Sequence, residues 1–504
     1  MNDRLIPFGP GAQAFILVYL FSLIVIGAVA YRARRDSSLK DFYLAGKGIG
    51  FVTLLLTLYS TQYSGNTLFG FTGATYRIGY SWAVCIHFMT SIVVVYLAFA
   101  PGLYRLAKQH HFITPVDYLD YRFGDWRLSL VSSIVMIGAI SNYLLAQLMA
   151  MGSALEGLTD ADPVRAYRAG VVVLALVIVV YESLGGFRAV AWTDVIQGTV
   201  LGVGFVLLLC AVCYEYGSIQ KASETLLANE PAKFKLPEAD WIRTWFSYVL
   251  VVGLGGALYP QSIQRIYAAK SAKTLQRSLR VMAFLPLTTT LIAVIVGIYG
   301  AANFPGLTRQ QSDTILTVVC RQIQQESLLG YWLVVVLFSA VLAAIMSTAD
   351  SVLLSISSMV TKDIYAKHCV RYFTKDPTQT QLTWFGKAFS WVLMVSLVIA
   401  ALRLRGRTLV ELLDYKFDLL VQLSPAFILS LHWRRMSSMP TLIGMVVGVA
   451  CSIGLAAAGF GKVVGFHAGL IALLVNGAIA VGGSLIMPDA QHGTCDQRPL
   501  ADAT

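Results

Sequence analysis

The chain contains 504 residues, of which 57% are hydrophobic and only 13% are charged, and its formal net charge is +11. Soluble domains contain about 25% charged residues, so this composition excludes a soluble globular domain and predicts an all-α polytopic membrane protein. The basic residues lie in short loops between apolar runs. Membrane topology explains that placement more simply than a nucleic-acid partner does.

Thirteen apolar runs are long enough to cross a bilayer, since about 20 helical residues span its hydrocarbon core. In chain order they are 12–31, 51–76, 82–101, 128–155, 169–187, 190–214, 241–263, 281–302, 330–358, 384–402, 409–432, 438–459 and 464–486. Little chain is left between them. We therefore expect a single transmembrane domain over residues 1–504, with a core at about 51–432 and peripheral helices at 12–31, 438–459 and 464–486.

The basic residues also select an orientation. Most of the 38 Lys and Arg residues lie on one side of the predicted topology, mainly in loops 32–50, 102–127, 264–280 and 359–383. Because loops rich in Lys and Arg stay in the cytoplasm, this bias predicts an outside N-terminus and an inside C-terminus. Arg403, Arg405 and Arg407 are the exception, since they fall outside in this scheme.

Two of the predicted spans are interrupted by polar residues, glycine or proline. The run LTLYSTQYSGNTLFGFTG (56–73) contains hydroxyl and amide residues around Gly65, and VVGLGGALYPQSIQR (251–265) contains three glycines before Pro260. A break in a membrane helix is tolerated only where it is buried in protein or lines a cavity. Breaks at matching positions of two halves indicate a transporter's binding site. The alternative is that the small residues only permit close helix packing.

The stretch AAIMSTADSVLLSISS (343–358) places hydroxyl groups inside an apolar span. Helical spacing brings Ser347, Ser351, Ser355 and Ser358 to one face. With Ala344 and Thr348, the first two of these serines form a patch of hydroxyl and carbonyl oxygens, which are ligands that suit a small hard cation such as sodium. The alternative is that each hydroxyl bonds the carbonyl four residues earlier.

Two carboxylates lie within the predicted spans. Carboxylates inside a membrane are rare and usually functional, and Asp350 follows Ser347 by about one helical turn. Asp194 lies near the start of span 190–214, so it either caps that helix or belongs to an ion pathway. Either carboxylate could instead carry a proton.

Other polar residues within the spans are weaker candidates. Tyr259 and Gln261 flank the second break and are predicted to contact a substrate. His87 and Gln422 either bond to neighbouring helices or contact the substrate.

Six segments together resemble one known family, the sodium:solute symporters. They are KDFYLAGKGIG (40–50), YSTQYSG (59–65), ESLGGFRAVAWTDVIQG (182–198), PQSIQR (260–265), AAIMSTADS (343–351) with TKDIY (361–365), and QLSPAF (422–427). The resemblance implies a LeuT-like core of two inverted five-helix repeats, here spans two to six and seven to eleven, with broken second and seventh helices.

The resemblance also implies binding residues. The main sodium site would use the carbonyl oxygens of Ser60, Tyr63 and Ala344 with the hydroxyls of Ser347 and Thr348. A second ion or a proton pathway would involve Asp194, Asp350 and Ser351, although Asp350 stands where members with a second sodium have a hydroxyl. The resemblance further implies substrate contacts at Thr67, Tyr143, Tyr259, Gln261 and Phe417.

The sequence therefore predicts a sodium-coupled symporter that imports a small organic solute by alternating access. Sodium would be its co-transported ion, with no organic cofactor, and the lipid bilayer its surroundings, most simply a bacterial plasma membrane. The alternatives are a proton-coupled symporter, a transporter-like sensor and a channel. The absence of HExxH and GxSxG motifs argues against an enzyme.

Overall fold

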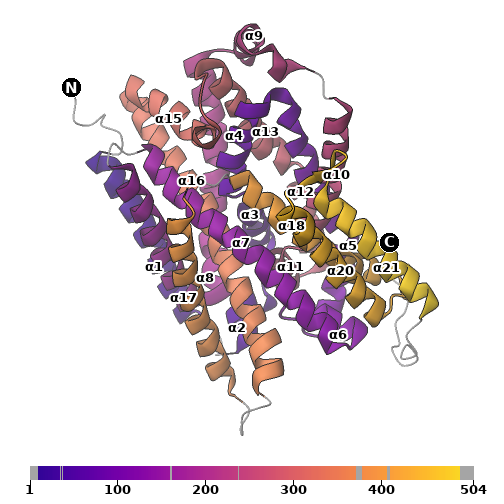
Figure 1. Cartoon of the computed structure of the whole chain (residues 1–504). Coiled ribbons are helices and arrows are strands. Elements are labelled where there is room, and N and C mark those ends of the chain that lie inside the picture. The colour runs from indigo at the N-terminus through magenta and orange to yellow at the C-terminus, as the bar shows by residue number, and fades with distance from the viewer. Residues whose placement is uncertain are drawn as a thin grey trace.

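The computed structural model describes residues 9–34, 36, 38–158, 162–235, 238–370, 377–405 and 409–487 (Figure 1). Within these ranges the regular secondary structure is helical apart from one short hairpin, β1 (Lys462–Val463) with β2 (Phe466–His467), and one isolated bridge between Ile49 and Ala269. The longer helices are α1 (Pro10–Arg32), α3 (Phe51–Gln62), α5 (Val84–Gln109), α7 (Trp126–Leu158), α8 (Pro163–Tyr216), α9 (Ile219–Asn229), α10 (Ala239–Ala257), α12 (Ala272–Met282), α13 (Leu285–Asn303), α15 (Ile315–Glu326), α16 (Leu328–Met359), α17 (Gln379–Arg403), α18 (Leu409–Leu420), α20 (Ser438–Ala457) and α21 (Ala468–Ile486).

Short helices and turns connect these elements. They are α2 (Leu39–Leu44), η2 (Ala45–Lys47), η3 (Asn66–Gly70), α4 (Phe71–Ile78), η4 (Gly79–Ala83), α6 (Asp117–Phe123), η5 (Pro231–Phe234), α11 (Pro260–Ala268), α14 (Arg309–Ser312), η6 (Val360–Cys369), η8 (Val421–Leu423), η9 (Pro425–Leu429) and α19 (Ser430–His432).

Nine continuous helical stretches of the described residues are long and apolar enough to cross a membrane, or ten if the bent pair α10 and α11 counts as one span. This number is lower than the thirteen predicted spans, because some predicted spans lie in the same helix and others are divided between shorter helices. The predicted spans 169–187 and 190–214 both lie in α8, which breaks at Gly186 (φ 55°, ψ −146°). The predicted span 51–76 is divided between α3, η3 and α4.

Both predicted helix breaks are confirmed. Helix α3 ends at Gln62, Tyr63 adopts an extended conformation (φ −103°, ψ 106°), and a π-helical turn follows at η3. Helix α10 ends at Ala257, and α11 continues from Pro260 after a bend of 50°. Proline fits the first turn of α11 because the backbone N–H it lacks would have no helical partner there.

Four loops that were predicted to share one side of the membrane meet at one end of the bundle. The backbone N–H of Ile49 donates to the carbonyl of Ala268, and the N–H of Lys270 donates to the carbonyl of Ile49. These two bonds join the segments 32–50 and 264–280. Lys47 Nζ donates to the carbonyl of Ala107 at 3.0 Å. Lys362 forms an ion pair with Asp117. These contacts agree with the predicted grouping of the loops.

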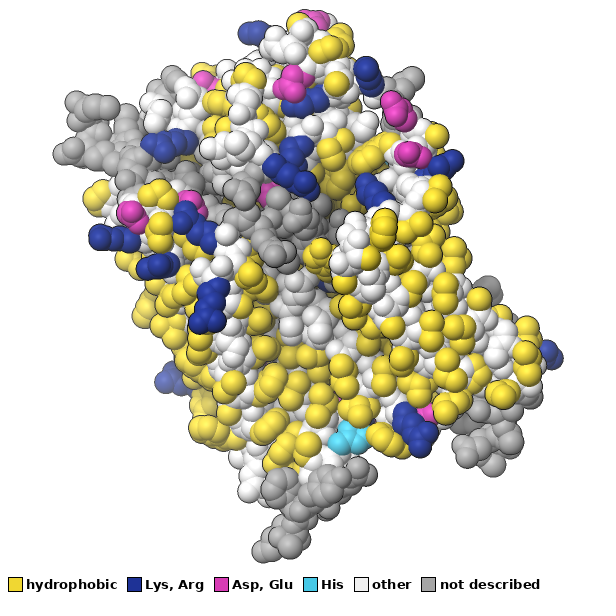
Figure 2. Space-filling view, viewed as in Figure 1, with side chains coloured by type: hydrophobic (Ala, Val, Ile, Leu, Met, Phe, Trp, Pro, Cys, Tyr) yellow, Lys and Arg dark blue, Asp and Glu magenta, His cyan; other side chains and the backbone are white. Residues whose placement is uncertain are grey.

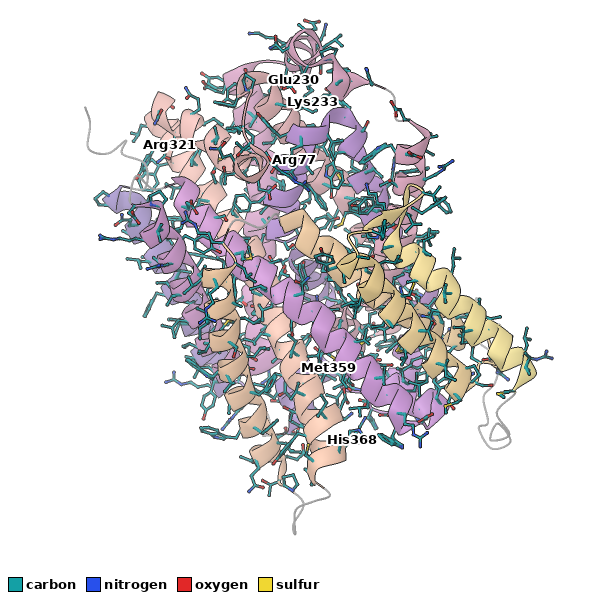
Figure 3. The ribbon with its side chains drawn as sticks, in the orientation of Figure 1. Arg77, Glu230, Lys233, Arg321, Met359 and His368 are labelled. Atoms are coloured by element: carbon teal, nitrogen blue, oxygen red, sulfur yellow. The ribbon has the colours of Figure 1, made fainter. Side chains whose placement is uncertain are left out.

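The surface has the charge distribution of a membrane protein. In Figure 2 hydrophobic side chains cover the middle of the visible face, while most charged side chains lie above them and a smaller group lies at the lower edge. Figure 3 labels Arg77, Glu230, Lys233 and Arg321 at the upper end, whereas Met359 and His368 lie toward the other end, along α16 and η6. The arrangement leaves an apolar band between two polar ends, as a bilayer requires.

The interior of the bundle is built around α16. This helix packs on α3, α7, α8 and α11, and every residue from Val341 to Met359 is buried. Gly204 on α8 permits the close approach, because a Cβ atom there would lie 2.5 Å from the Cβ of Ala340 on α16. The polar residues of α16 therefore face the protein interior and not lipid.

Candidate ion and substrate site

The break after α3 faces the hydroxyl patch of α16. The Thr348 hydroxyl lies 3.1 Å from the carbonyl oxygen of Ala344 and 3.5 Å from that of Ser60. Ser60, Ala344, Ser347 and Thr348 are fully buried, and Tyr63 is 1% exposed. The structure thus brings together oxygens of Ser60, Ala344 and Thr348, and it places Ser347 one residue before Thr348 on the same helix.

Ser347 Oγ and Asp194 Oδ1 are among the buried side-chain atoms of the described residues that make no well-formed hydrogen bond, although the Ser347 hydroxyl lies close enough to the Asp194 carboxylate to interact with it. The large majority of buried side-chain polar atoms in native proteins have a partner. Oxygen atoms that lack one are suited to coordinate a hard cation.

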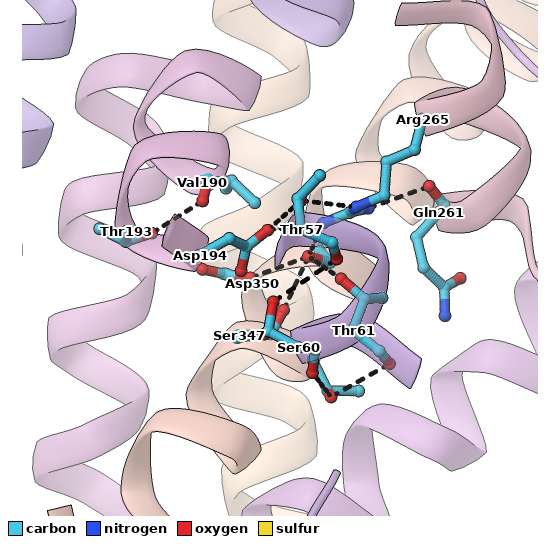
Figure 4. A network of polar contacts seen from close by, with 12 residues as sticks. Thr57, Ser60, Thr61, Val190, Thr193, Asp194, Gln261, Arg265, Ser347 and Asp350 are labelled. Atoms are coloured by element: carbon cyan, nitrogen blue, oxygen red, sulfur yellow. Dashed lines mark hydrogen bonds and ion pairs between the residues drawn. The ribbon is translucent and has the colours of Figure 1, made fainter. Parts of the chain in front are cut away.

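The arginine of α11 organises the polar network next to this patch (Figure 4). Arg265 Nη2 lies 2.9 Å from Asp194 Oδ2 and donates to Ser351 Oγ at 2.5 Å. Arg265 Nε donates to Thr57 Oγ1 at 2.7 Å, and Thr57 in turn donates to Asp194. One guanidinium therefore connects α11 with α3, α8 and α16. Asp194 lies inside α8, well after the break at Gly186 and not at a helix start. The structure therefore does not support the alternative that Asp194 caps a helix.

Asp350 faces α8, and a hydroxyl lies next to each of its carboxylate oxygens. The Tyr181 hydroxyl donates to Asp350 Oδ2 at 2.5 Å, and Ser351 Oγ lies 3.0 Å from Asp350 Oδ1. Asp350 is fully buried. The second predicted carboxylate thus lies in the same polar interior as Asp194, linked to it through Ser351 and Arg265.

The hydroxyls of α16 also make the local bonds that the alternative predicted. Ser351 donates to the carbonyl of Ser347 at 2.7 Å, four residues earlier, as Thr348 does to Ala344. Ser355 and Ser358 bond the side-chain amide of Gln264 on α11, both at 2.6 Å. The prediction that these residues share one face is confirmed, and that face contacts α3 and α11.

Three predicted substrate residues form an aromatic group. The rings of Tyr143 and Tyr259 are stacked with centroids 5.5 Å apart, and Phe417 lies 5.7 Å from Tyr259. Gln261 is fully buried, and neither of its amide atoms has a hydrogen-bond partner among the described residues. Thr67 is 3% exposed, in the turn η3 that follows the first break.

Two other predicted substrate residues lie elsewhere. His87 is exposed on the surface of the bundle and accepts a hydrogen bond from Trp245 Nε1 at 3.0 Å. Gln422 is buried against the last helix, where its amide nitrogen donates to the carbonyl of Gly469 at 3.1 Å and its carbonyl oxygen accepts from Asn476 at 3.3 Å. Both residues form the helix-to-helix bonds that were the alternative to substrate contact.

Sequence reasoning did not single out the two cations of this region. Arg265 ends the quoted motif PQSIQR, and Lys416 lies in the predicted span 409–432. The structure buries both, with 1% of each residue exposed. The signal that would have found them is the rarity of charged side chains in membrane spans, which applies to cations as it does to carboxylates.

Together these features define a polytopic membrane transporter with two broken helices around a buried polar site. Residues 42–448 match the family described as "Sodium:solute symporter family". The chain belongs to this family. It is a sodium-coupled solute symporter and not an enzyme.

Relatives and solved structures agree with this assignment. The chain is 29% identical to the high-affinity proline transporter PutP of Bacillus subtilis over 464 residues, which cover 90% of this chain and 94% of the relative. It is 26% identical to the sodium/pantothenate symporter of Haemophilus influenzae over 491 residues, covering 93% and 95%. The fold is that of a Na⁺-coupled sialic acid symporter, with a TM-score of 0.78 at 20% identity over 95% of this chain and 98% of the other. Mhp1, a nucleobase-cation-symport-1 family transporter, aligns with a TM-score of 0.53 at 14% identity, covering 89% and 95%.

Proposed function

We propose that the protein imports a small organic solute together with sodium by alternating access, and that sodium binds between the break after α3 and the hydroxyl patch of α16. The ligands would be the carbonyl oxygens of Ser60, Tyr63 and Ala344 and the hydroxyls of Ser347 and Thr348. The observation that carries the proposal is the position of Thr348 Oγ1, which contacts the carbonyls of both Ala344 and Ser60 and so joins the two helices.

The solute would bind at the second break, next to Tyr143, Tyr259, Gln261 and Phe417. Tyr143 links the two sites, because its ring stacks on that of Tyr259 and its phenol lies near the hydroxyls of Ser64 and Thr348. Sodium that orders the α3 break would fix Tyr143 and raise the affinity for the solute. By linkage, the solute must raise the affinity for sodium by the same factor.

The proposal includes the topology. The whole chain would form one transporter domain of thirteen spans in a bacterial plasma membrane, with the N-terminus outside. Spans two to six and seven to eleven would be two inverted repeats. The two breaks support this division, because each occurs in the first span of its repeat.

A proton-coupled symporter is the second candidate. The observation that favours it is Asp350, a fully buried carboxylate held by the Tyr181 hydroxyl. In the first candidate, Asp194, Asp350 and Ser351 would hold a second sodium. In the second candidate they would carry a proton.

A thermal-shift screen of the purified protein tests both candidates. Small carboxylates, amino acids, vitamins and sugars would be added in sodium and in potassium, because a ligand that binds the native state stabilises it by mass action. Stabilisation by a solute only in sodium supports sodium coupling. If every stabilising solute acts equally in both salts and a proton gradient drives uptake, the protein is a proton-coupled symporter and the sodium-coupled candidate is wrong.

Variants of α16 test the site itself. Ser347→Ala and Thr348→Ala should raise the sodium concentration for half-maximal uptake by reconstituted protein about tenfold or more, with a smaller effect on the maximal rate. The matched control is Ser339→Ala on the same helix, whose hydroxyl bonds the Val335 carbonyl at 3.0 Å. If the sodium dependence of Ser347→Ala and Thr348→Ala is unchanged, the proposed sodium site is wrong. Uptake by the protein alone would also exclude a sensor that requires a partner.

A further inference from the structure

A cavity of about 260 Å³ lies at the loop end of the bundle, away from the ion and substrate site. It is bounded by the end of α1, by α2, by the break in α8 and by the first turns of α17. The helices α1, α2 and α17 all pack on α8 at one flank of the bundle (Figure 1). Cations and aromatic rings line the cavity together, namely Arg34, Lys387, Tyr31, Phe42 and Trp384. We call it the flank cavity.

We propose that the flank cavity binds the headgroup of an anionic phospholipid, and that Arg34 and Lys387 contact the phosphate. The cavity lies at the end of the bundle that is predicted to face the cytoplasm. Basic pockets between membrane helices on that side typically bind anionic headgroups. The proposal goes beyond solute symport, because it assigns a ligand that is bound and not transported.

The two cations of the flank cavity rest on aromatic rings. The Arg34 guanidinium lies 4.2 Å from the ring centroid of Tyr31, and Lys387 Nζ lies 5.0 Å from that of Phe42. Neither cation forms an ion pair with a described residue. An aromatic face holds a cation in place without neutralising its charge. Both side chains can therefore form charge-assisted hydrogen bonds to a phosphate.

The acidic residues around the flank cavity have other surroundings. Asp41 Oδ1 lies 2.7 Å from Arg188 Nη2, and Asp36 Oδ1 accepts a hydrogen bond from the backbone N–H of Ser38 at 2.8 Å. Glu182 lies near Lys387 but is fully buried inside the bundle. Basic residues outnumber acidic ones here, with Arg32, Arg34, Lys40, Arg188 and Lys387 against Asp36, Asp41 and Glu182. The local charge therefore favours an anion.

The position of the flank cavity fits a lipid better than a soluble phosphate. Tyr31 and Trp384 both line it and are both exposed on the surface of the bundle. Tyrosine and tryptophan are enriched where a membrane protein meets the headgroup region. Two cations next to two exposed aromatic residues therefore place the cavity at the depth of a phospholipid headgroup.

Apolar side chains continue from the flank cavity along two helices. Trp391 lies on the same face of α17 as Trp384, and Val173 and Val180 lie on the same face of α8 as Leu184, which lines the cavity. Trp391 and Val173 are exposed, and Val180 is half-buried. These surfaces would contact the acyl chains of a lipid whose headgroup occupies the cavity.

A bound headgroup would stabilise the break in α8. Gly185 lines the flank cavity, and the next residue, Gly186, adopts the positive φ of the break. A Cβ atom on Gly186 would lie 2.5 Å from the carbonyl oxygen of Phe42, so α2 packs directly on the break. A phosphate that joins Arg34 of the α1 end to Lys387 of α17 would hold these elements around it.

The first test compares two lipids that differ in headgroup charge. Delipidated protein would be titrated with phosphatidylglycerol and with phosphatidylcholine of the same acyl chains, and binding would be followed by native mass spectrometry and by melting temperature. We expect phosphatidylglycerol to bind and to raise the melting temperature, and phosphatidylcholine to bind at least tenfold more weakly. Inorganic phosphate and glycerol 3-phosphate carry the anion without acyl chains, and neither should stabilise the protein at the same concentration.

Variants then assign the binding to the flank cavity. The double variant Arg34→Gln with Lys387→Gln should weaken phosphatidylglycerol binding about 30-fold, and Arg34→Gln alone about fivefold. The single variant guards against misfolding, because Arg34 is exposed and its replacement should leave the melting temperature without lipid unchanged. The matched control is Lys273→Gln with Arg277→Gln, which removes two exposed cations from α12 at the same end of the bundle.

Each outcome decides the assignment. If phosphatidylcholine binds as tightly as phosphatidylglycerol, or if both double variants lose the anionic lipid equally, the cavity is not a headgroup site. If free phosphate stabilises the protein as well as the lipid does, the ligand is a soluble anion and the lipid assignment is wrong. Binding that is lost in the cavity variant and kept in the α12 variant establishes it. None of these measurements depends on transport, so their failure would leave sodium symport unaffected.

Discussion

Arg265 and Asp194 form an ion pair in the middle of the helical bundle, with 2.9 Å between Nη2 and Oδ2 and side-chain exposures of 1% and 0%. Attraction between two buried charges offsets the cost of removing both from water only when the geometry is good and further hydrogen bonds are made. Here Thr57 and Ser351 provide those bonds. The pair holds α11 against α8, next to the proposed sodium ligands.

The first prediction concerns this arginine. Arg265→Gln leaves the Asp194 carboxylate buried without its cation, which should lower stability by about 3–5 kcal/mol. Sodium should then raise the melting temperature of Arg265→Gln more than that of the wild type, because a bound cation can compensate Asp194. The measurement is the melting temperature of each protein across a sodium titration against potassium.

A second buried pair on α8 supplies the control. Arg188 Nη2 lies 2.7 Å from Asp41 Oδ1, with side-chain exposures of 10% and 5%. Arg188→Gln should also lose stability, but its response to sodium should match that of the wild type. If the two variants respond equally to sodium, Asp194 is not part of an ion site.

The helix breaks and the hydroxyl face could be predicted because both depend on local sequence. Gly65 and Pro260 lie within or next to their breaks, and the serines of α16 share a face through helical spacing alone. The partnership of Arg265 with Asp194 could not be predicted, since it joins residues 71 positions apart through the packing of four helices.

The substrate assignments were based on the polarity of residues in apolar runs and could not take helix packing into account. His87 and Gln422 are both polar residues in apolar runs, but one faces outward and the other bonds to the last helix. Lys416 lies beside Phe417, which was predicted, yet a single lysine in an otherwise apolar span gives no indication of which side chains it will meet. Which face of a helix turns inward depends on neighbours that are distant in sequence.

The second prediction concerns Tyr181 and Asp350. Tyr181→Phe removes the donor to Asp350 Oδ2 and should cost about 1–3 kcal/mol, the penalty for an unsatisfied buried acceptor. In an Asp350→Asn background the same change should cost less, so a double-mutant cycle should give a coupling of about 0.5–3 kcal/mol. The free energies would come from reversible unfolding in detergent micelles.

Tyr43 provides the comparison for that cycle. Its phenol bonds Ser357 Oγ at 2.9 Å, on another part of α16. Tyr43→Phe should lower stability equally in the wild type and in Asp350→Asn. Coupling of similar size for both tyrosines would show that the effect is a general loosening of α16 and not the bond to Asp350.

The third prediction is a pH dependence at the loop end of the bundle. Burial, with a smaller contribution from Lys40 and Lys108, lowers the pKa of Lys47 to about 8 from its ordinary 10.5. Above about pH 8 the folded protein therefore binds fewer protons than the unfolded chain, so stability should rise with pH until about 10.5. Lys47→Met should flatten this rise in melting temperature. An equal slope in both proteins would assign the effect to other groups.

The fourth prediction concerns the space around the first break. A Cβ atom on Gly65 would lie 2.9 Å from Ala150 Cβ, 2.9 Å from Ile345 Cγ1 and 3.3 Å from Gln147 Oε1. Gly65→Ala should therefore push the break away from α7 and α16, at a cost of about 1–3 kcal/mol for overpacking. Because Ser60 and Tyr63 would move relative to Thr348, the sodium concentration for half-maximal uptake should rise.

Gly138→Ala on α7, where a Cβ meets nothing within 4 Å, should leave sodium dependence unchanged. A Gly65→Ala protein that loses stability but keeps the wild-type sodium response would show that the break is only a packing element and that sodium binds elsewhere.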